Sequence, residues 1–149
     1  MSKPVKWLLL PAVIAVAGVG ACLLTDGDGP FLNLEKVGQD ARIPVAAILP
    51  EGVASLCVLG PYQEPALWRD RPDPALMRQL DPGPVPEDAV RVALFDRAGA
   101  LIREAELPRT AGPNRVQLAD GVGARCDEVG VMMVDIAVTG RSRTVRFSE

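Results

Sequence analysis

Glycine and proline interrupt this chain at short intervals beyond its first thirty residues. The 149-residue sequence contains fourteen of each. The apolar segments between them are short and follow one another at about eight to twelve residues, which is typical of antiparallel sheets with tight turns. The sequence therefore predicts a mostly β fold, a small antiparallel β-sandwich or barrel with one long proline-rich loop. An N-terminal apolar signal or anchor helix is expected in front of it.

The clearest local prediction is a β-hairpin. The segments Val90 to Phe95 and Ala100 to Leu107 flank Asp96-Arg97-Ala98-Gly99, with aspartate at the first and glycine at the last position, as a type I turn prefers. Other strands are expected at 43–49, 53–59, 115–118, 131–138 and 144–147, with turns at 120–123 and at Gly140. Asp135 interrupts the most apolar of these strands, and we expect it to face solvent rather than a buried arginine.

The segment from Gly60 to Asp88 differs from the rest because it holds seven of the fourteen prolines. Prolines at this density exclude a central strand and a long helix. One short helix is predicted, with Asp73 as N-cap, Pro74 at its first position and 75–80 following. A connection this long in a small domain is usually functional or mobile.

The same segment carries the side chains that are enriched at binding hot spots, namely aromatic residues and arginines. The candidate partner contacts are Tyr62, Trp68, Arg69 and Arg71. The alternative is that Trp68 and Leu76 cap the open end of the sheet as a minor core. Both interpretations stay open on the sequence.

The first thirty residues have the pattern of an export signal. Lys3 and Lys6 precede an apolar run from Trp7 to Leu24, after which charged and glycine residues begin. Val19-Gly20-Ala21-Cys22 within this run resembles the lipobox of bacterial lipoproteins, although the usual leucine is missing. The resemblance implies that Cys22 is lipidated and becomes the first residue of the mature chain, on the periplasmic face of a bacterial membrane.

Three other fates of the N-terminal segment remain open. Residues 7–24 are just long enough for an uncleaved membrane anchor, cleavage could follow Ala15-Val16-Ala17, and a buried helix of a soluble protein is the fourth alternative. Both the lipoprotein and the anchor place the domain outside the cytoplasm, and the lysines ahead of the run agree with this, because positive flanks stay in the cytoplasm. The expected organisation is a signal or anchor at 1–24, a flexible tether at 25–42 and one extracytoplasmic β-rich domain at 43–149.

Two cysteines, Cys57 and Cys126, remain in the domain, and an even count in an oxidising compartment predicts a disulfide. The expected bridge links the strand beginning at Val53 to the segment entering the strand at Val131. Two buried free thiols are the alternative. Adjacent Met132 and Met133 would point to opposite faces of a strand, which indicates packing rather than copper binding.

Composition excludes several classes of function. Beyond residue 24, fourteen cationic side chains stand against nineteen anionic ones, a net charge of −5, which argues against nucleic acid as a partner. The chain has no histidine, so the usual catalytic triads and zinc sites are not expected. Acid pairs such as Glu104 and Glu106, or Asp127 and Glu128, are interpreted as solvated surface. No catalytic residue, metal or cofactor is predicted.

The function expected from these observations is a non-catalytic, membrane-tethered envelope protein that binds a protein or another envelope component. The alternative is an accessory subunit of a membrane complex, with residues 7–24 as a single transmembrane helix. Ala15, Gly18 and Ala21 recur at helix-face spacing, which suits close helix contact in a bilayer. A signal peptidase needs the same small residues, so they do not decide between the two.

Overall fold

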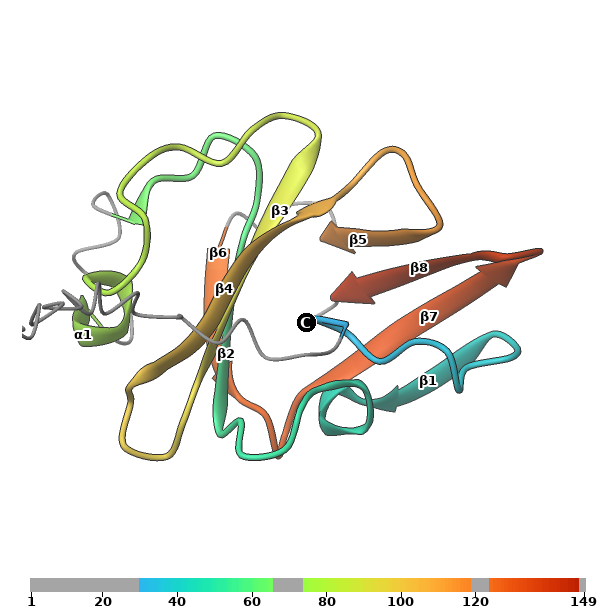
Figure 1. Cartoon of the computed structure of the whole chain (residues 1–149), viewed down its shortest axis with the longest axis horizontal. Helices are drawn as coiled ribbons and strands as arrows, with labels where there is room; N and C mark the ends of the chain where they lie inside the picture. The colour runs from blue at the N-terminus through green and yellow to red at the C-terminus, as the bar shows by residue number, and fades with distance from the viewer. Residues whose placement is uncertain (1–29, 66–73, 119–123, 148–149) are drawn as a thin grey trace, which may run out of the picture.

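Two four-stranded sheets make up most of the computed structural model, which describes residues 30–65, 74–118 and 124–147 (Figure 1). Sheet A has the strand order β1-β7-β8-β5 and sheet B the order β4-β3-β2-β6. The strands are β1 (Ala41–Pro44), β2 (Ser55–Leu59), β3 (Ala89–Phe95), β4 (Leu101–Pro108), β5 (Asn114–Leu118), β6 (Ala124–Glu128), β7 (Met133–Thr139) and β8 (Ser142–Phe147). All neighbours are antiparallel except β5 and β8, which are parallel. The prediction of a mostly β chain is confirmed.

The two sheets share one hydrophobic core. Alternate residues of β3, beginning with Val90, point toward sheet A, and Ile136 and Val145 of sheet A point back. Successive side chains of a strand lie on opposite faces, so the remaining residues of β3 lie on the outer face of sheet B. All seven residues of β3 are nevertheless buried.

A second hydrophobic core explains why the outer face of sheet B is also buried. Part of the proline-rich segment lies over this face and includes the short helix α1 (Pro74–Met77) (Figure 1). We call residues 74–88 the cap. Its apolar side chains pack with outward-facing residues of sheet B to form this second core, which comprises Cys57, Leu59, Leu76, Met77, Leu80, Val85, Ala89, Ala93, Phe95 and Ala124.

The hairpin between β3 and β4 has the predicted turn. The Asp96 carbonyl oxygen accepts a hydrogen bond from the Gly99 N–H at 3.0 Å. The Asp96 carboxylate accepts from the N–H groups of Ala98 and Ala100 at 2.8 and 2.9 Å. Gly99 has φ +79°, a conformation that glycine adopts without steric cost. Beyond the turn a β-bulge interrupts the register, because Leu94 opposes Arg103, Phe95 opposes Leu101, and Ile102 has no partner.

The structure differs from the expected elements near the N-terminus. The strand predicted at 43–49 is split into β1 and a 3-10 helix at Val45–Ile48, since Pro44 cannot donate to the strand ladder. Part of the predicted tether packs on the domain. Phe31 and Leu34 are buried in the shared core, and the Arg103 guanidinium lies 5.1 Å from the centre of the Phe31 ring.

Strand β6 was not expected, because its sequence Ala-Arg-Cys-Asp-Glu is short and charged. It pairs with β2 along its whole length and brings Cys126 directly opposite Cys57. The cross-link therefore joins neighbouring strands of one sheet, because the segment that leads into β7, where the sequence placed Cys126, is itself strand β6. Short, charged strands are usual at sheet edges, where they discourage pairing with other chains.

Several predictions lie outside the described residues. They are the signal or anchor at 1–24, the helix cap at Asp73 and the turn at 120–123. Within the described ranges, no helix has the length and apolarity that crossing a membrane requires.

Candidate functional site

The disulfide lies on the outer face of sheet B, within the second core. Cys57 and Cys126 are bonded, with Cα atoms 4.0 Å apart and a sequence separation of 69 residues. Cys57 is fully buried and Cys126 partly buried, and both pack with the apolar residues of the cap and sheet. The pairing predicted from the cysteine count is thus present, and it joins β2 to β6.

A buried arginine holds the cap against the sheet. Arg91 of β3 is only 3% exposed, and its Nη1 donates to the carbonyl oxygens of Asp81 and Gly83 in the cap, at 2.8 and 2.9 Å. Its Nη2 donates to Oε1 of Glu106 at 2.7 Å, and its Nε lies 3.4 Å from Oε1 of Glu104. One guanidinium thereby connects the cap with two glutamates of β4.

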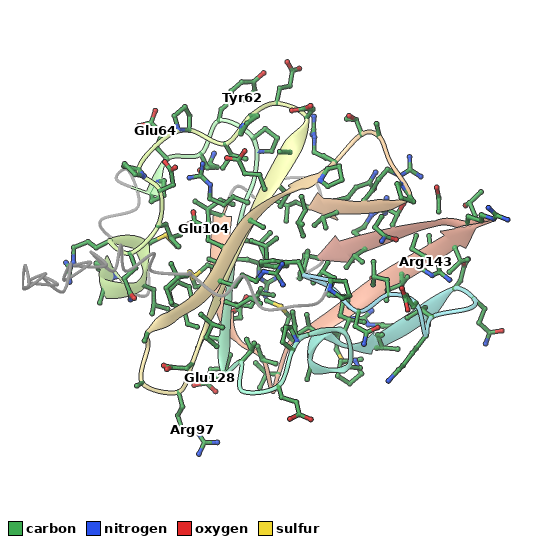
Figure 2. The ribbon with its side chains drawn as sticks, viewed as in Figure 1. Tyr62, Glu64, Arg97, Glu104, Glu128 and Arg143 are labelled. Atoms are coloured by element: carbon green, nitrogen blue, oxygen red, sulfur yellow. A yellow bond between two sulfur atoms is a disulfide. The ribbon has the colours of Figure 1, made fainter. Side chains whose placement is uncertain are left out.

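Glu104 is the most constrained carboxylate of this cluster. Its two oxygens share the N–H of Asp81 at 3.2 Å each, and its side chain is 19% exposed. Burial raises the pKa of Glu104 above the ordinary value of 4.5, and this effect outweighs the Asp81 N–H and the Arg91 charge, both of which lower it. Figure 2 shows Glu104 on β4, midway along sheet B.

The interpretation of Glu104 and Glu106 as solvated surface is wrong for Glu104, whose side chain is 19% exposed, whereas Glu106 is 42% exposed. Both lie on the outer face of sheet B, because Glu106 opposes Arg91 and Glu104 opposes Ala93. The β-bulge at Ile102 is the cause. Without the extra residue, the two glutamates would oppose Val90 and Val92 and point into the shared core.

A second contact fixes the cap beside the hairpin turn. The Gln79 amide donates to the Gly99 carbonyl oxygen at 2.8 Å and accepts from the Leu101 N–H at 2.9 Å. Because the amide is both donor and acceptor, it extends the cap contacts to the end of the hairpin.

Tyr62 lies at the opposite end of sheet B from the hairpin turn, as Figure 2 shows by the positions of Tyr62 and Arg97. It is the only described residue other than glycine with a positive φ, +64°. Its side chain is exposed, and the residue retains 65% of its accessible surface. A hydrogen bond to Glu87 is the main cause that raises the pKa of the Tyr62 phenol, while the nearby Arg109 charge acts the other way.

Backbone hydrogen bonds hold Tyr62 in this conformation. Its N–H donates to the Val85 carbonyl oxygen at 2.8 Å, the Val85 N–H donates to the Gln63 carbonyl oxygen at 3.1 Å, and Gln63 closes a turn on Gly60 at 3.2 Å. A bulky residue in the left-handed region costs about 1–3 kcal/mol and is retained only where its surroundings enforce it. The cap residue Val85 provides that enforcement here.

Of the four candidate contact residues, the structure describes only Tyr62. Trp68, Arg69 and Arg71 lie outside the described residues, as does the lipidation candidate Cys22. Of the two residues in the alternative interpretation, Leu76 is buried in the second core. It covers the outer face of sheet B rather than an open end.

The outer face of sheet A carries polar side chains. One row crosses its four strands, because Arg42 opposes Asp135, Asp135 opposes Arg146 and Arg146 opposes Gln117. The Asp135 side chain is 45% exposed, and its Oδ1 lies 4.0 Å from Arg42 Nε. Asp135 therefore faces the solvated side of the sheet, as predicted, and its neighbours there are arginines.

A shallow hollow of about 980 Å³ lies at the hairpin end of sheet B. Its lining comes from three loops, at 52–55, 96–98 and 128–130. Figure 2 shows Arg97 and Glu128 at this end. The Arg97 side chain points away from the domain, and Asp96 is engaged in its own turn. These residues present no evident cofactor site.

The remaining sequence interpretations concern chemistry. Met132 is buried and Met133 is exposed, as their predicted opposite orientation requires. Asp127 forms an ion pair with Arg125. In the described part of the chain, no three His, Cys, Asp or Glu side chains are grouped so as to hold a metal ion.

Comparison of the chain with protein-family models, with curated proteins and with solved structures finds no match.

Sequence reasoning missed Arg91, although a signal for it exists. It is the only charged residue in the apolar run Ala89–Phe95, and the partner strand of the predicted hairpin carries two glutamates at alternate positions. An arginine inside a buried strand needs paired acceptors. That requirement, applied to the residue pattern of the hairpin, points to Glu104 and Glu106.

Proposed function

We propose that this chain is a non-catalytic, membrane-tethered β-sandwich protein of the bacterial cell envelope, on the periplasmic face, that binds a protein or another envelope component. The tether rests on the sequence of residues 1–24, with its lipobox-like Val19 to Cys22. The disulfide agrees with an oxidising compartment, since disulfides persist there and are rare in the cytosol. Two sheets on a shared core support the assignment as a sandwich.

The observation that carries the binding proposal is the conformation of Tyr62. Backbone strain of this kind clusters at functional sites, because the fold gains nothing by keeping it elsewhere. Tyrosine is enriched at binding hot spots, where its ring supplies apolar area and its hydroxyl a polar contact. Tyr62 combines strain, exposure and a hydroxyl already oriented by Glu87.

Crosslinking in intact cells tests the contact surface. A photoreactive phenylalanine analogue replaces Tyr62 in one variant and Val131 in the other. Val131 is a matched control because it is 76% exposed and follows Glu128, at the other end of sheet B. We expect one discrete crosslinked species from position 62 and none from position 131. Equal products from both positions, or none from position 62, would contradict the proposal.

A substitution to glycine separates binding from folding at the same position. Glycine adopts φ +64° without steric cost, so Tyr62→Gly relieves strain of about 1–2 kcal/mol, partly offset by the greater freedom of glycine in the unfolded chain. We expect unchanged or slightly higher thermal stability together with loss of the crosslinked partner from co-purification. A marked fall in stability would show that Tyr62 has a structural role instead.

The intact mass of the protein from its native membrane tests the tether. Loss of residues 1–21 with a lipid-sized addition on Cys22 is the expected result, and Cys22→Ser should then accumulate as the uncleaved precursor. A full-length, unmodified chain would favour the accessory-subunit alternative, with residues 7–24 as a transmembrane helix.

A further inference from the structure

The charges at the junction of cap and sheet do not balance. Among the described residues, Arg91 is the one cation that acts on Glu104, whereas three carboxylates lie there, those of Asp81, Glu104 and Glu106. Two of the hydrogen bonds donated by Arg91 go to neutral carbonyl oxygens of the cap. The junction therefore holds excess negative charge, and the Glu104 carboxylate is the part of it most shielded from water, with 19% of its side chain exposed.

Of the two glutamates, Glu104 has the weaker interaction with the positive charge of Arg91. Arg91 approaches Glu106 at 2.7 Å but Glu104 only at 3.4 Å, and the single N–H of Asp81 is divided between both Glu104 oxygens. Glu104 is also the more buried, with 19% of its side chain exposed against 42% for Glu106. A buried carboxylate without full compensation favours its neutral form.

We propose that the cap closes onto sheet B with uptake of one proton at Glu104, so that closure becomes stronger as the solution turns from neutral to mildly acidic. A protonated Glu104 leaves Arg91 and Glu106 as a balanced ion pair at 2.7 Å. It keeps an oxygen that can accept from Asp81. The cap is thus a pH-responsive element of the domain.

The direction follows from linkage. Burial raises the pKa of Glu104 in the closed domain, and opening of the cap returns it toward the ordinary value of 4.5. The closed form therefore binds more protons than the open form between these two values. Closure of the cap becomes more favourable as the pH falls through the raised pKa of Glu104. This stabilisation is complete below about pH 4.5.

The proposed contact surface is coupled to this closure. Val85 of the cap exchanges backbone hydrogen bonds with Tyr62 and Gln63, so a more firmly closed cap holds Tyr62 more firmly in its strained conformation. This consequence rests on the proposed function, whereas proton uptake by the cap does not.

Hydrogen exchange measured at pH 7.5 and pH 4.5, and corrected for intrinsic exchange rates, tests the proposal without any partner. The reporters are the amides of Asp81, Gly83 and Val85, and the reference is sheet A. We expect cap protection to increase on acidification by at most about tenfold per pH unit, the limit for one proton, while sheet A does not change. Constant or falling cap protection would overturn the proposal.

Two variants localise the effect. Glu104→Gln mimics the protonated side chain, so its cap should be as protected at pH 7.5 as that of the unaltered protein at pH 4.5, with no further response. Asp135→Asn is the matched control on the open face of sheet A and should keep the full response. A response that persists in Glu104→Gln would assign the proton to another group and refute the role of Glu104.

A titration of the unaltered protein tests the proposal without relying on the correct folding of a variant. The side-chain carboxyl carbon of Glu104, followed by NMR, should titrate above the ordinary range of glutamate. A midpoint at or below pH 4.5 would refute the proposal whatever the variants do. Crosslinking at Tyr62 is scored separately, so failure of the proposed binding function does not affect this result.

Discussion

The two sheets differ in what covers their outer faces. On sheet B the cap buries Phe95, Leu59 and the disulfide, and every residue of β3 is inaccessible. On sheet A the corresponding face presents Arg42 and Asp135 to solvent. The sequences of the strands reflect this difference. Strand β3 is an almost continuous apolar run, whereas β8 alternates between polar and apolar residues from Thr144 to Phe147.

The comparison shows where the domain depends on a few specific contacts. Sheet A needs only one apolar face, which the shared core supplies. Sheet B has a second apolar face, which the cap covers. The buried Arg91 joins the cap to this sheet. Substitutions on the covered face should therefore be costly, and equivalent substitutions on the open face should not.

The largest effect is expected from removal of the disulfide. Replacement of Cys57 and Cys126 by alanine together should lower the free energy of unfolding by about 4 kcal/mol, since the bridge closes a loop of about seventy residues. Denaturant unfolding of the double variant beside the oxidised parent measures this. A loss below about 1 kcal/mol would mean that the cap and sheet B are held together without the bridge.

Loss of the buried arginine comes next. Arg91→Met should destabilise the domain by about 3 kcal/mol, because it leaves two glutamates and two cap carbonyl groups without their donor. Arg42→Met, on the open face, is the control and should change stability by less than about 0.5 kcal/mol. Equal effects of the two substitutions on stability would contradict the expected difference between the covered face of sheet B and the open face of sheet A.

A smaller loss is expected from the apolar part of the cap. Leu76→Ala removes a buried side chain at the edge of the second core and should cost about 2 kcal/mol, the low end for leucine truncation, because the cap can settle into the space. Hydrogen exchange should locate the loss in 74–88 and spare sheet A. Uniform loss of protection across both sheets would show that the cap does not open by itself.

The smallest effect belongs to the open face. Asp135→Asn weakens an exposed pair with Arg42 and should change the free energy of unfolding by less than about 0.5 kcal/mol. Thermal unfolding at low and high salt measures it. A loss above about 1 kcal/mol would indicate that the polar row across sheet A stabilises the domain as a network.

Local chemistry accounts for what could be predicted. The hairpin was predictable because Asp96 and Gly99 make the turn with their own side chain and backbone. Strand β6 was not, because a short charged segment becomes a strand only through pairing with β2. Among the candidate site residues, Tyr62 could be singled out as an aromatic residue of the proline-rich segment, but its left-handed conformation depends on Val85, twenty-three positions away.

By itself, the sequence determined the mostly β character, the main turn and the pairing of the two cysteines, because each depends on residue type or on neighbours along the chain. Tertiary structure alone decided the face on which Glu104 and Glu106 lie. The bulge at Ile102 moves the side chains of the residues beyond it to the opposite face of the sheet. It also decided that the segment expected to form a loop would bury the outer face of sheet B. A side-chain direction in a strand changes with a single inserted residue, and coverage of a face depends on contacts between distant segments, so neither can be read from local pattern.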